Sequence, residues 1–234
     1  MAGETLRAPA RLQVPAALLL TGQLLYIAVT QLHAGGDAND HHAIFATYAH
    51  NTIWMDVHLG QFLAIAILSA GLVGLFSIFD PQATGGRWVA RLGMIAAAVA
   101  VSLYGALQAV DGVALKQATS AWMAAPEVEK AARFAAAEVV RWLEWGMRSY
   151  QDYALGLTLL LVAAVAWSPR WMPRLIPILV GLSGLAYLVQ GWVAGSEGFS
   201  GTQSLAIVAG WALCLVWMIW LAVIAWRAGN ADAL

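Results

Sequence analysis

The chain has 234 residues, of which 61% are hydrophobic and 11% are charged, with a formal net charge of −1 at pH 7. Soluble domains carry about 25% charged residues, and nucleic-acid-binding domains are usually strongly basic, so we expect neither class. The single cysteine, Cys214, excludes an internal disulfide, a cysteine-rich metal site and the attachment of a c-type haem. Long apolar stretches predict an all-α, polytopic membrane protein.

Taken in chain order, the apolar stretches predict one transmembrane domain (1–234) with six spans. Pro81, Pro169 and Pro173 stand in short polar breaks between spans, where proline starts or ends helices. The first stretch lacks a cleavage pattern of small residues, so we predict an uncleaved span rather than a signal peptide. The six spans cover about residues 13–31, 53–79, 88–111, 147–167, 172–194 and 203–227.

Positive charge predicts the orientation of these spans. The connections after spans one and five contain no lysine or arginine. By the positive-inside rule, both termini are therefore predicted to be cytoplasmic. The residues that indicate the cytoplasmic side are Arg7, Arg11, Arg87, Arg91, Arg170, Arg174 and Arg227.

Three helices are predicted to be longer than a membrane requires, because about 20 residues span a bilayer. Asp40 is a suitable N-cap for the second helix, and Pro126 is a suitable first residue for the fourth. We predict that helices two, three and four project together on the extracytoplasmic side, with a hairpin near Ala125. The alternative is a break near Gly146 that leaves a separate surface helix. The three long stretches are 40–79, 88–124 and 126–167.

Polar residues in these separate stretches fall at one depth. Counted from the cytoplasmic helix ends, they lie about 30–35 Å along the helices, near the outer boundary of the hydrocarbon. Since lipid solvates charge poorly, such residues usually face a bundle interior or a water-filled cavity. We predict an outward-facing pocket between helices two, three and four, closed by the turn 194–201. Its lining residues are predicted to be His50, Trp54, His58, Gln61, Gln108, Asp111, Arg141, Glu144, Arg148 and Asp152.

All five histidines lie between residues 33 and 58. His50 and His58 are two turns apart on the predicted helix, about 12 Å, so they cannot share one zinc ion. His58 could instead join Asp111 and Glu144 in a carboxylate-rich set suited to Zn, Mn or Fe. A b-type haem with ligands from facing helices is disfavoured, because all histidines belong to one helix and its preceding loop.

Charges alternate in sign along one face of the fourth helix, at Glu138, Arg141, Glu144, Arg148 and Asp152. This ladder is typical of a salt-bridged scaffold or of a binding face.

Three functions therefore stay open. The first is an outward-facing polar pocket that binds a small molecule, a lipid headgroup or a metal ion. The second is an integral-membrane enzyme with a His/carboxylate acid–base or metal site, for which the sequence identifies no nucleophile. The third is a structural or assembly subunit. We expect membrane lipid and a small-molecule ligand as partners, and no nucleic acid; homo-oligomerisation is not decided.

The segments "LQAVDGVALK", "EVVRWLEWGMRSYQDYALG" and "LAYLVQGWVAGSEGFS" resemble a family of uncharacterised six-helix membrane proteins from bacteria. The resemblance covers most of the chain from the first span onward. It implies a location in the bacterial inner membrane. Because the family has no established activity, the resemblance transfers no catalytic residue.

Overall fold

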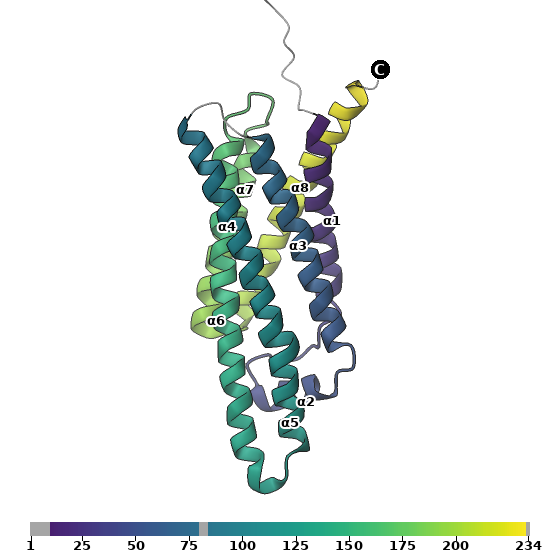
Figure 1. Cartoon of the computed structure of the whole chain (residues 1–234), viewed down its shortest axis with the longest axis vertical. Helices are drawn as coiled ribbons and strands as arrows, with labels where there is room; N and C mark the ends of the chain where they lie inside the picture. Colours follow the sequence, from purple (N-terminus) through teal and green to yellow (C-terminus); the bar gives the residue numbers. More distant parts are fainter. Residues whose placement is uncertain (1–9, 80–83, 233–234) are drawn as a thin grey trace, which may run out of the picture.

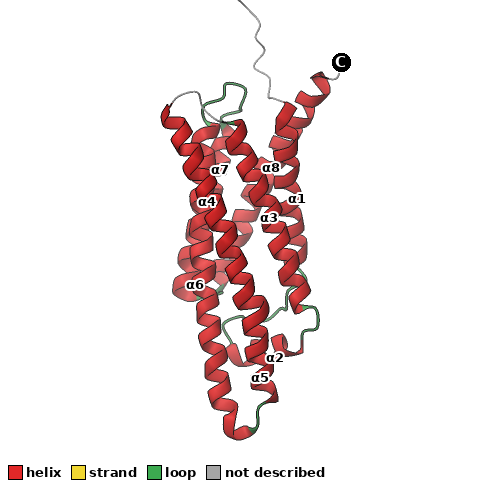
Figure 2. Ribbon diagram, viewed as in Figure 1, coloured by secondary structure: helices red, strands yellow, loops and turns green. Residues whose placement is uncertain are grey.

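The computed structural model describes residues 10–79 and 84–232, and every regular element within those ranges is helical (Figure 2). Six helical stretches are long and apolar enough to cross a membrane, which confirms the predicted all-α, six-span class. A single 3-10 turn, η1 (Ala10–Leu12), comes first. The other elements are α1 (Gln13–Thr30), α2 (His41–His50), α3 (Trp54–Ile78), α4 (Thr84–Gln108), the π-helical segment η2 (Ala109–Leu115), α5 (Lys116–Ala124), α6 (Glu127–Ala166), α7 (Leu175–Glu197) and α8 (Gly201–Asp232).

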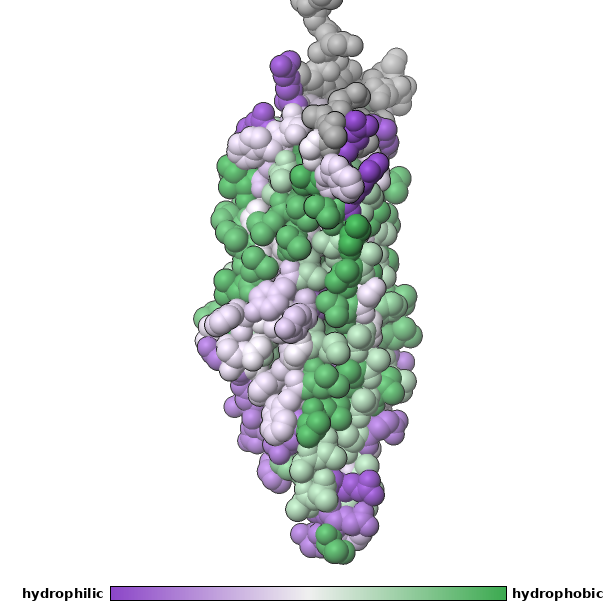
Figure 3. All heavy atoms as spheres, turned by 60° about the vertical axis from the view of Figure 1, so that its left-hand side comes forward, coloured by the Kyte–Doolittle hydropathy of each residue, from purple (hydrophilic) through white to green (hydrophobic). Residues whose placement is uncertain are grey.

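The long helices run roughly along one axis of an elongated bundle (Figure 1). The start of α1 and the end of α8 lie at one end of the bundle, and the turn between α5 and α6 lies at the other. Hydrophilic side chains gather toward both ends of the face shown in Figure 3, and apolar side chains dominate between them. This distribution is the one expected of a bundle that crosses a membrane.

A large apolar core joins α1, α3, α6, α7 and α8, with Leu72, Val162 and Trp217 among its buried side chains. Within this bundle α6 packs against α7 and α4, while α1 packs against α3 and α8. Gly156 of α6 and Gly184 of α7 let their helices approach closely, since a Cβ on either residue would lie within 3.0 Å of the other's carbonyl oxygen. Small residues commonly permit such approaches between membrane helices.

The predicted long third and fourth helices are confirmed. The stretch 85–124, which includes η2, and the stretch Glu127–Ala166 each contain 40 residues. At about 1.5 Å per residue each is about 60 Å long, twice the thickness of a bilayer's hydrocarbon. The two stretches turn at Ala125, where the backbone becomes extended, and α6 is continuous through Gly146. The side of the membrane that this extension faces stays a prediction.

The prediction of an unbroken second helix is wrong. Asp40 does cap a helix, because its carboxylate accepts a hydrogen bond from the Ala43 amide. That helix, however, ends at His50, and α3 begins at Trp54. The Asn51 side chain accepts a hydrogen bond from the Ile53 amide, which stabilises a turn in place of the helix.

A lysine from another helix holds this break in place. Lys116 of α5 donates hydrogen bonds to the carbonyl oxygens of Tyr48, Ala49 and Asn51, each at 2.8 Å. These contacts satisfy carbonyl groups that the end of a helix leaves without partners. The separated α2 packs against α5. A second apolar core is formed by α2 with residues of α3, η2, α5 and α6. It contains Ile44, Phe45, Tyr48, Trp54, Leu115, Trp122 and Ala137.

Candidate functional site

A cavity of about 310 Å³ lies next to this second core. Its lining comes from α1, α2, α3, α4, η2, α6 and α8, and from the loops before α2 and α8. The cavity therefore has more walls than the three helices predicted from the sequence. Six of the predicted residues line it: Gln61, Gln108, Asp111, Arg141, Glu144 and Arg148. Other residues with polar or aromatic side chains complete it: Tyr26, Thr30, His33, Tyr48, Tyr104, Phe199 and Trp211.

The remaining four predicted residues lie elsewhere. Trp54 and His58 are buried beside the cavity, and Asp152 is buried behind Arg148. His50 is exposed near the end of α2. The sequence predicted that His50 and His58 lie on one continuous helix. Because the helix breaks after His50, the two residues lie on different helices, α2 and α3.

Three side chains with atoms that can bind a metal ion converge at one wall of the cavity. One ring nitrogen each from His33 and His58 and one carboxylate oxygen of Asp111 lie within 4.8 Å of one another. His58 Nε2 is 3.0 Å from Asp111 Oδ2. These residues come from the loop before α2, from α3 and from η2. His33 therefore occupies the place that the sequence had suggested for Glu144.

Backbone carbonyls orient both imidazole rings. His58 Nδ1 lies 2.6 Å from the Trp54 carbonyl oxygen, and His33 Nδ1 lies 3.2 Å from the Ala34 carbonyl oxygen. Since a carbonyl oxygen only accepts, each Nδ1 carries the proton that it donates. The Nε2 atoms are then left to act as acceptors or ligands when the rings are neutral.

Trp54 contacts His58 through its backbone and Asp111 through its side chain. The Trp54 carbonyl accepts from His58, and the Trp54 indole N–H donates to the Asp111 carbonyl at 3.1 Å. The Trp54 ring also lies against His33, with ring centroids 4.9 Å apart. Replacement of this tryptophan would therefore disturb all three converging residues.

The π-helical segment η2 brings Asp111 to His58. A Cβ atom added to Gly112 would lie 2.7 Å from the Cβ of His58, so only glycine allows this approach between η2 and α3. π-Helical segments are frequent at functional sites. Here the segment places a carboxylate in an otherwise apolar stretch next to an imidazole.

Arg141 joins α6 to the two segments that cover the cavity. Its guanidinium donates to Glu144 Oε2 at 2.7 Å and to the Ala38 carbonyl at 2.8 Å. The same group lies 4.6 Å from the ring centroid of Phe199. Asn39 further joins these segments, because its side chain donates to the Glu197 carbonyl and accepts from the Phe199 amide.

A second ion pair lies deeper in the bundle. Arg148 Nε donates to Asp152 Oδ2 at 2.9 Å, and Arg148 NH1 donates to the Tyr26 hydroxyl at 3.1 Å. Tyr26 also contacts Tyr104 and Trp211 edge to face. Four of the five ladder residues are thus paired within α6, as Arg141 with Glu144 and Arg148 with Asp152, and both arginines also contact other elements.

The buried charges around the cavity nearly cancel. Among the residues that the structure describes, two arginines and three carboxylates are buried here: Arg141, Arg148, Asp111, Glu144 and Asp152. Their formal sum is negative by one charge when the imidazoles are neutral, and a proton or a cation between His58 Nε2 and Asp111 Oδ2, which lie 3.0 Å apart, would balance it. Burial lowers the pKa of His33 below its ordinary value of 6.5, so this ring is neutral at pH 7 and is in the form that binds metals.

The other histidines make different contacts. His41 pairs with Glu138 at 2.9 Å, and His42 stacks on Phe134 with ring centroids 4.2 Å apart. His33 differs from these two, because it lines the cavity close to His58 and Asp111. The signal that could have distinguished it is weak: His33 directly follows the first span, at the same depth as His58.

Comparisons with known proteins add no identification. No family model, no curated protein and no solved structure matches the chain. This result is consistent with the resemblance to an uncharacterised family, and it supplies no activity to transfer.

Proposed function

We propose that this membrane protein binds one divalent transition-metal ion through His33, His58 and Asp111. The observation that carries the proposal is the convergence of their three donor atoms from three separate segments. Two imidazoles and a carboxylate form a ligand set that suits Zn²⁺ or Fe²⁺.

The distances support this ligand set. Zinc ligands lie about 2.0–2.2 Å from the ion, so two ligands of a tetrahedral site are about 3.3 Å apart. His58 Nε2 and Asp111 Oδ2, at 3.0 Å, are already close to that separation. His33 lies in a loop, and its ring would move inward by about 1.5 Å at most to complete the site.

The bonds to the two Nδ1 atoms also support metal binding. In metal sites, a ligating histidine usually donates its other ring N–H to a carbonyl or carboxylate. The carbonyls of Trp54 and Ala34 accept from His58 and His33 in that way. For His58 this arrangement fixes the tautomer that presents Nε2 to an ion beside Asp111.

Three protein ligands leave room for a further ligand on the cavity side. Structural zinc sites usually have four protein ligands, whereas catalytic sites have three and a water molecule. The lining of the cavity by His33 and Asp111 therefore favours an enzyme over a purely structural site. In that case the metal would activate water or polarise a bound substrate.

We further propose an inner-membrane location with cytoplasmic termini and an outward-facing site. The argument is the positive-inside rule. The connection between α6 and α7 and the end of α8 lie at the same end of the bundle as the start of α1 (Figure 1). Arginines near these points would place that end in the cytoplasm, and the cavity lies toward the opposite end.

Metal analysis of the full chain tests the proposal. The protein should be purified in detergent with a tag that contains no histidine, reloaded with Zn²⁺, Fe²⁺ or Mn²⁺, and measured by mass spectrometry of the metal. We expect about one ion per chain, and loss of this ion in His33→Ala and His58→Ala. His50→Ala is the matched control, because His50 is exposed on α2, and it should retain the ion.

Two results would overturn the proposal. One is folded protein that takes up none of these metals after reloading. The other is equal loss of metal in His50→Ala and His58→Ala, which would indicate nonspecific binding. In the first case, His58 and Asp111 would be an imidazole–carboxylate pair without a metal, and the acid–base alternative would replace this one.

A further inference from the structure

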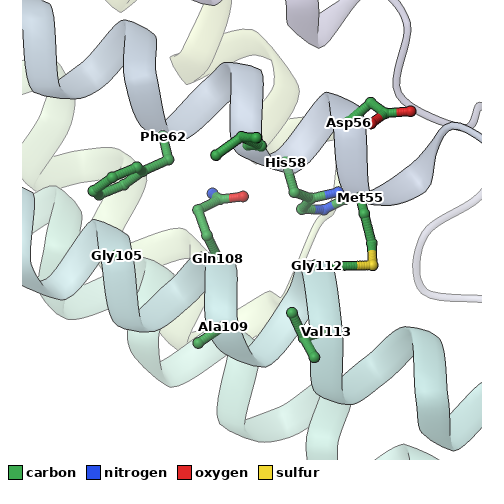
Figure 4. Close-up of a pocket in the computed structure, with 10 residues that line it drawn as sticks. Met55, Asp56, His58, Phe62, Gly105, Gln108, Ala109, Gly112 and Val113 are labelled. Carbon is green, nitrogen blue, oxygen red and sulfur yellow. The ribbon is translucent and has the colours of Figure 1, made fainter.

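A second hollow lies on the other side of His58. It is a groove of about 400 Å³ between α3 and the stretch formed by α4 and η2 (Figure 4). Apart from Asp56, His58 and Gln108, the residues that line it are apolar: Met55, Leu59, Phe62, Gly105, Ala109, Gly112 and Val113. Met55, Leu59 and Val113 are exposed, so in a membrane this groove would face lipid.

The groove and the polar cavity share part of their walls. Gln108 lines both hollows, and His58 lines the groove while its ring contacts Asp111 of the cavity. In Figure 4 the side chains of His58 and Gln108 lie between the two helices, whereas Asp56 points away from the groove. The side-chain oxygen of Gln108, Oε1, is buried and has no hydrogen-bond partner among the residues that the structure describes. A polar group that passes between these side chains would find an acceptor there.

The groove also has a direction. His58 is about one turn from the start of α3, while Phe62 and Gly105 lie further toward the middle of the bundle. The polar end of the groove is thus near the expected membrane boundary, and the apolar end extends into the hydrocarbon. A membrane amphiphile is oriented in the same way.

We propose that the groove holds the alkyl chain of a membrane amphiphile. The polar head of this amphiphile passes between the side chains of His58 and Gln108 and reaches the metal. This inference rests on the proposed metal site and names the substrate class for it. A water-soluble ligand would not need an apolar groove that opens toward lipid. The charged cavity accommodates the head, while the chain stays in surroundings as apolar as the bilayer.

Photolabelling with one defined probe tests this inference. The probe is an alkyl hydroxamate with a diazirine in the middle of its chain, since hydroxamates chelate zinc and iron. It is added to zinc-loaded protein in phosphatidylcholine nanodiscs, and the labelled peptides are mapped by mass spectrometry. We expect adducts to concentrate on residues 55–62 and 105–113, and to fall to background when the metal is removed with a chelator.

Two tryptophan variants provide a matched pair. Gly105→Trp fills the groove from α4, where an added side chain would meet Phe62, and should abolish the labelling, although its metal content should be unchanged. Val99→Trp places the same side chain at an exposed position of α4 outside the groove, and it should label like the parent protein. Both variants keep every proposed metal ligand.

The outcomes separate the two proposals. If zinc is bound but adducts spread equally to lipid-facing residues of α7, such as Ile178 and Leu182, the amphiphile inference is overturned and the metal site stands. Zinc-loaded protein with no adducts on residues 55–62 and 105–113 would also overturn it. If no metal is bound, the proposed function fails and this inference fails with it.

Discussion

Two buried polar regions of the molecule differ in how their charges are balanced. On α6, Arg141 pairs with Glu144 and Arg148 pairs with Asp152, so each charge has its counterion within one turn of the same helix. At the junction of α3 and η2, His58 and Asp111 meet His33 from a loop, and both Nδ1 atoms are already occupied by carbonyls.

This difference separates a scaffold from a candidate binding site. A helix that carries its own counterions neutralises its buried charges without a ligand. His58 and Asp111 can pair directly as imidazolium and carboxylate at 3.0 Å, but the approach of a second imidazole, that of His33, to the same point is better explained by the proposed metal ion. The ladder is therefore better explained as a scaffold, and the cluster as the site.

The largest expected effect comes from breaking the scaffold. Arg148→Met leaves the Asp152 carboxylate buried without its counterion, which should lower the free energy of unfolding by about 3–5 kcal/mol. Unfolding by SDS titration in mixed micelles measures this loss. The double variant Arg148→Met/Asp152→Leu should recover most of the stability, because it removes both charges.

An exposed pair on the same helix provides the control for that experiment. Arg133 and Glu129 form an ion pair with both side chains about half exposed, and Arg133→Met should cost less than about 1 kcal/mol. Equal losses in the Arg148 and Arg133 variants would show that the buried pair is no more important than a surface pair.

A second pair of variants should separate stability from metal binding. Asp111→Asn should weaken zinc binding more than about 100-fold, since even the residues that support metal ligands contribute 10–100-fold. Glu144→Gln should weaken zinc binding less than about tenfold, because its carboxylate is held by Arg141. Its main effect should be lower stability. Zinc titration of the folded fraction measures both affinities, and the reverse ranking would restore Glu144 to the ligand set.

Features that depend on local sequence could be predicted. The absence of proline and the length of the apolar stretches predicted the two 40-residue helical stretches and the hairpin at Ala125. Counting residues along those helices also placed Gln108, Asp111 and Arg148 at one depth. These three residues do line a common cavity.

Features that depend on contacts between distant segments could not be predicted. The second helix breaks at Asn51, where Lys116 from another helix binds the freed carbonyls. His33 lies in the loop before α2, and Arg141 of α6 donates a hydrogen bond to the Ala38 carbonyl of that loop. No periodicity or spacing in the sequence shows where a loop goes, so the third member of the cluster was taken to be Glu144.

The smallest expected effect concerns the loop that joins the two regions. Asp40 caps α2 through the Ala43 amide, and α2 positions Tyr48 against Trp54, with ring centroids 4.2 Å apart. Asp40→Ala should cost about 1 kcal/mol, which corresponds to about fivefold faster hydrogen exchange in α2 if that helix opens locally. Asp40→Asn, which retains a capping oxygen, should exchange nearly as slowly as the parent. Faster exchange in α3 and α6 as well would show that α2 opens together with the bundle. In that case the cluster of His33, His58 and Asp111 would depend directly on the ion-paired face of α6.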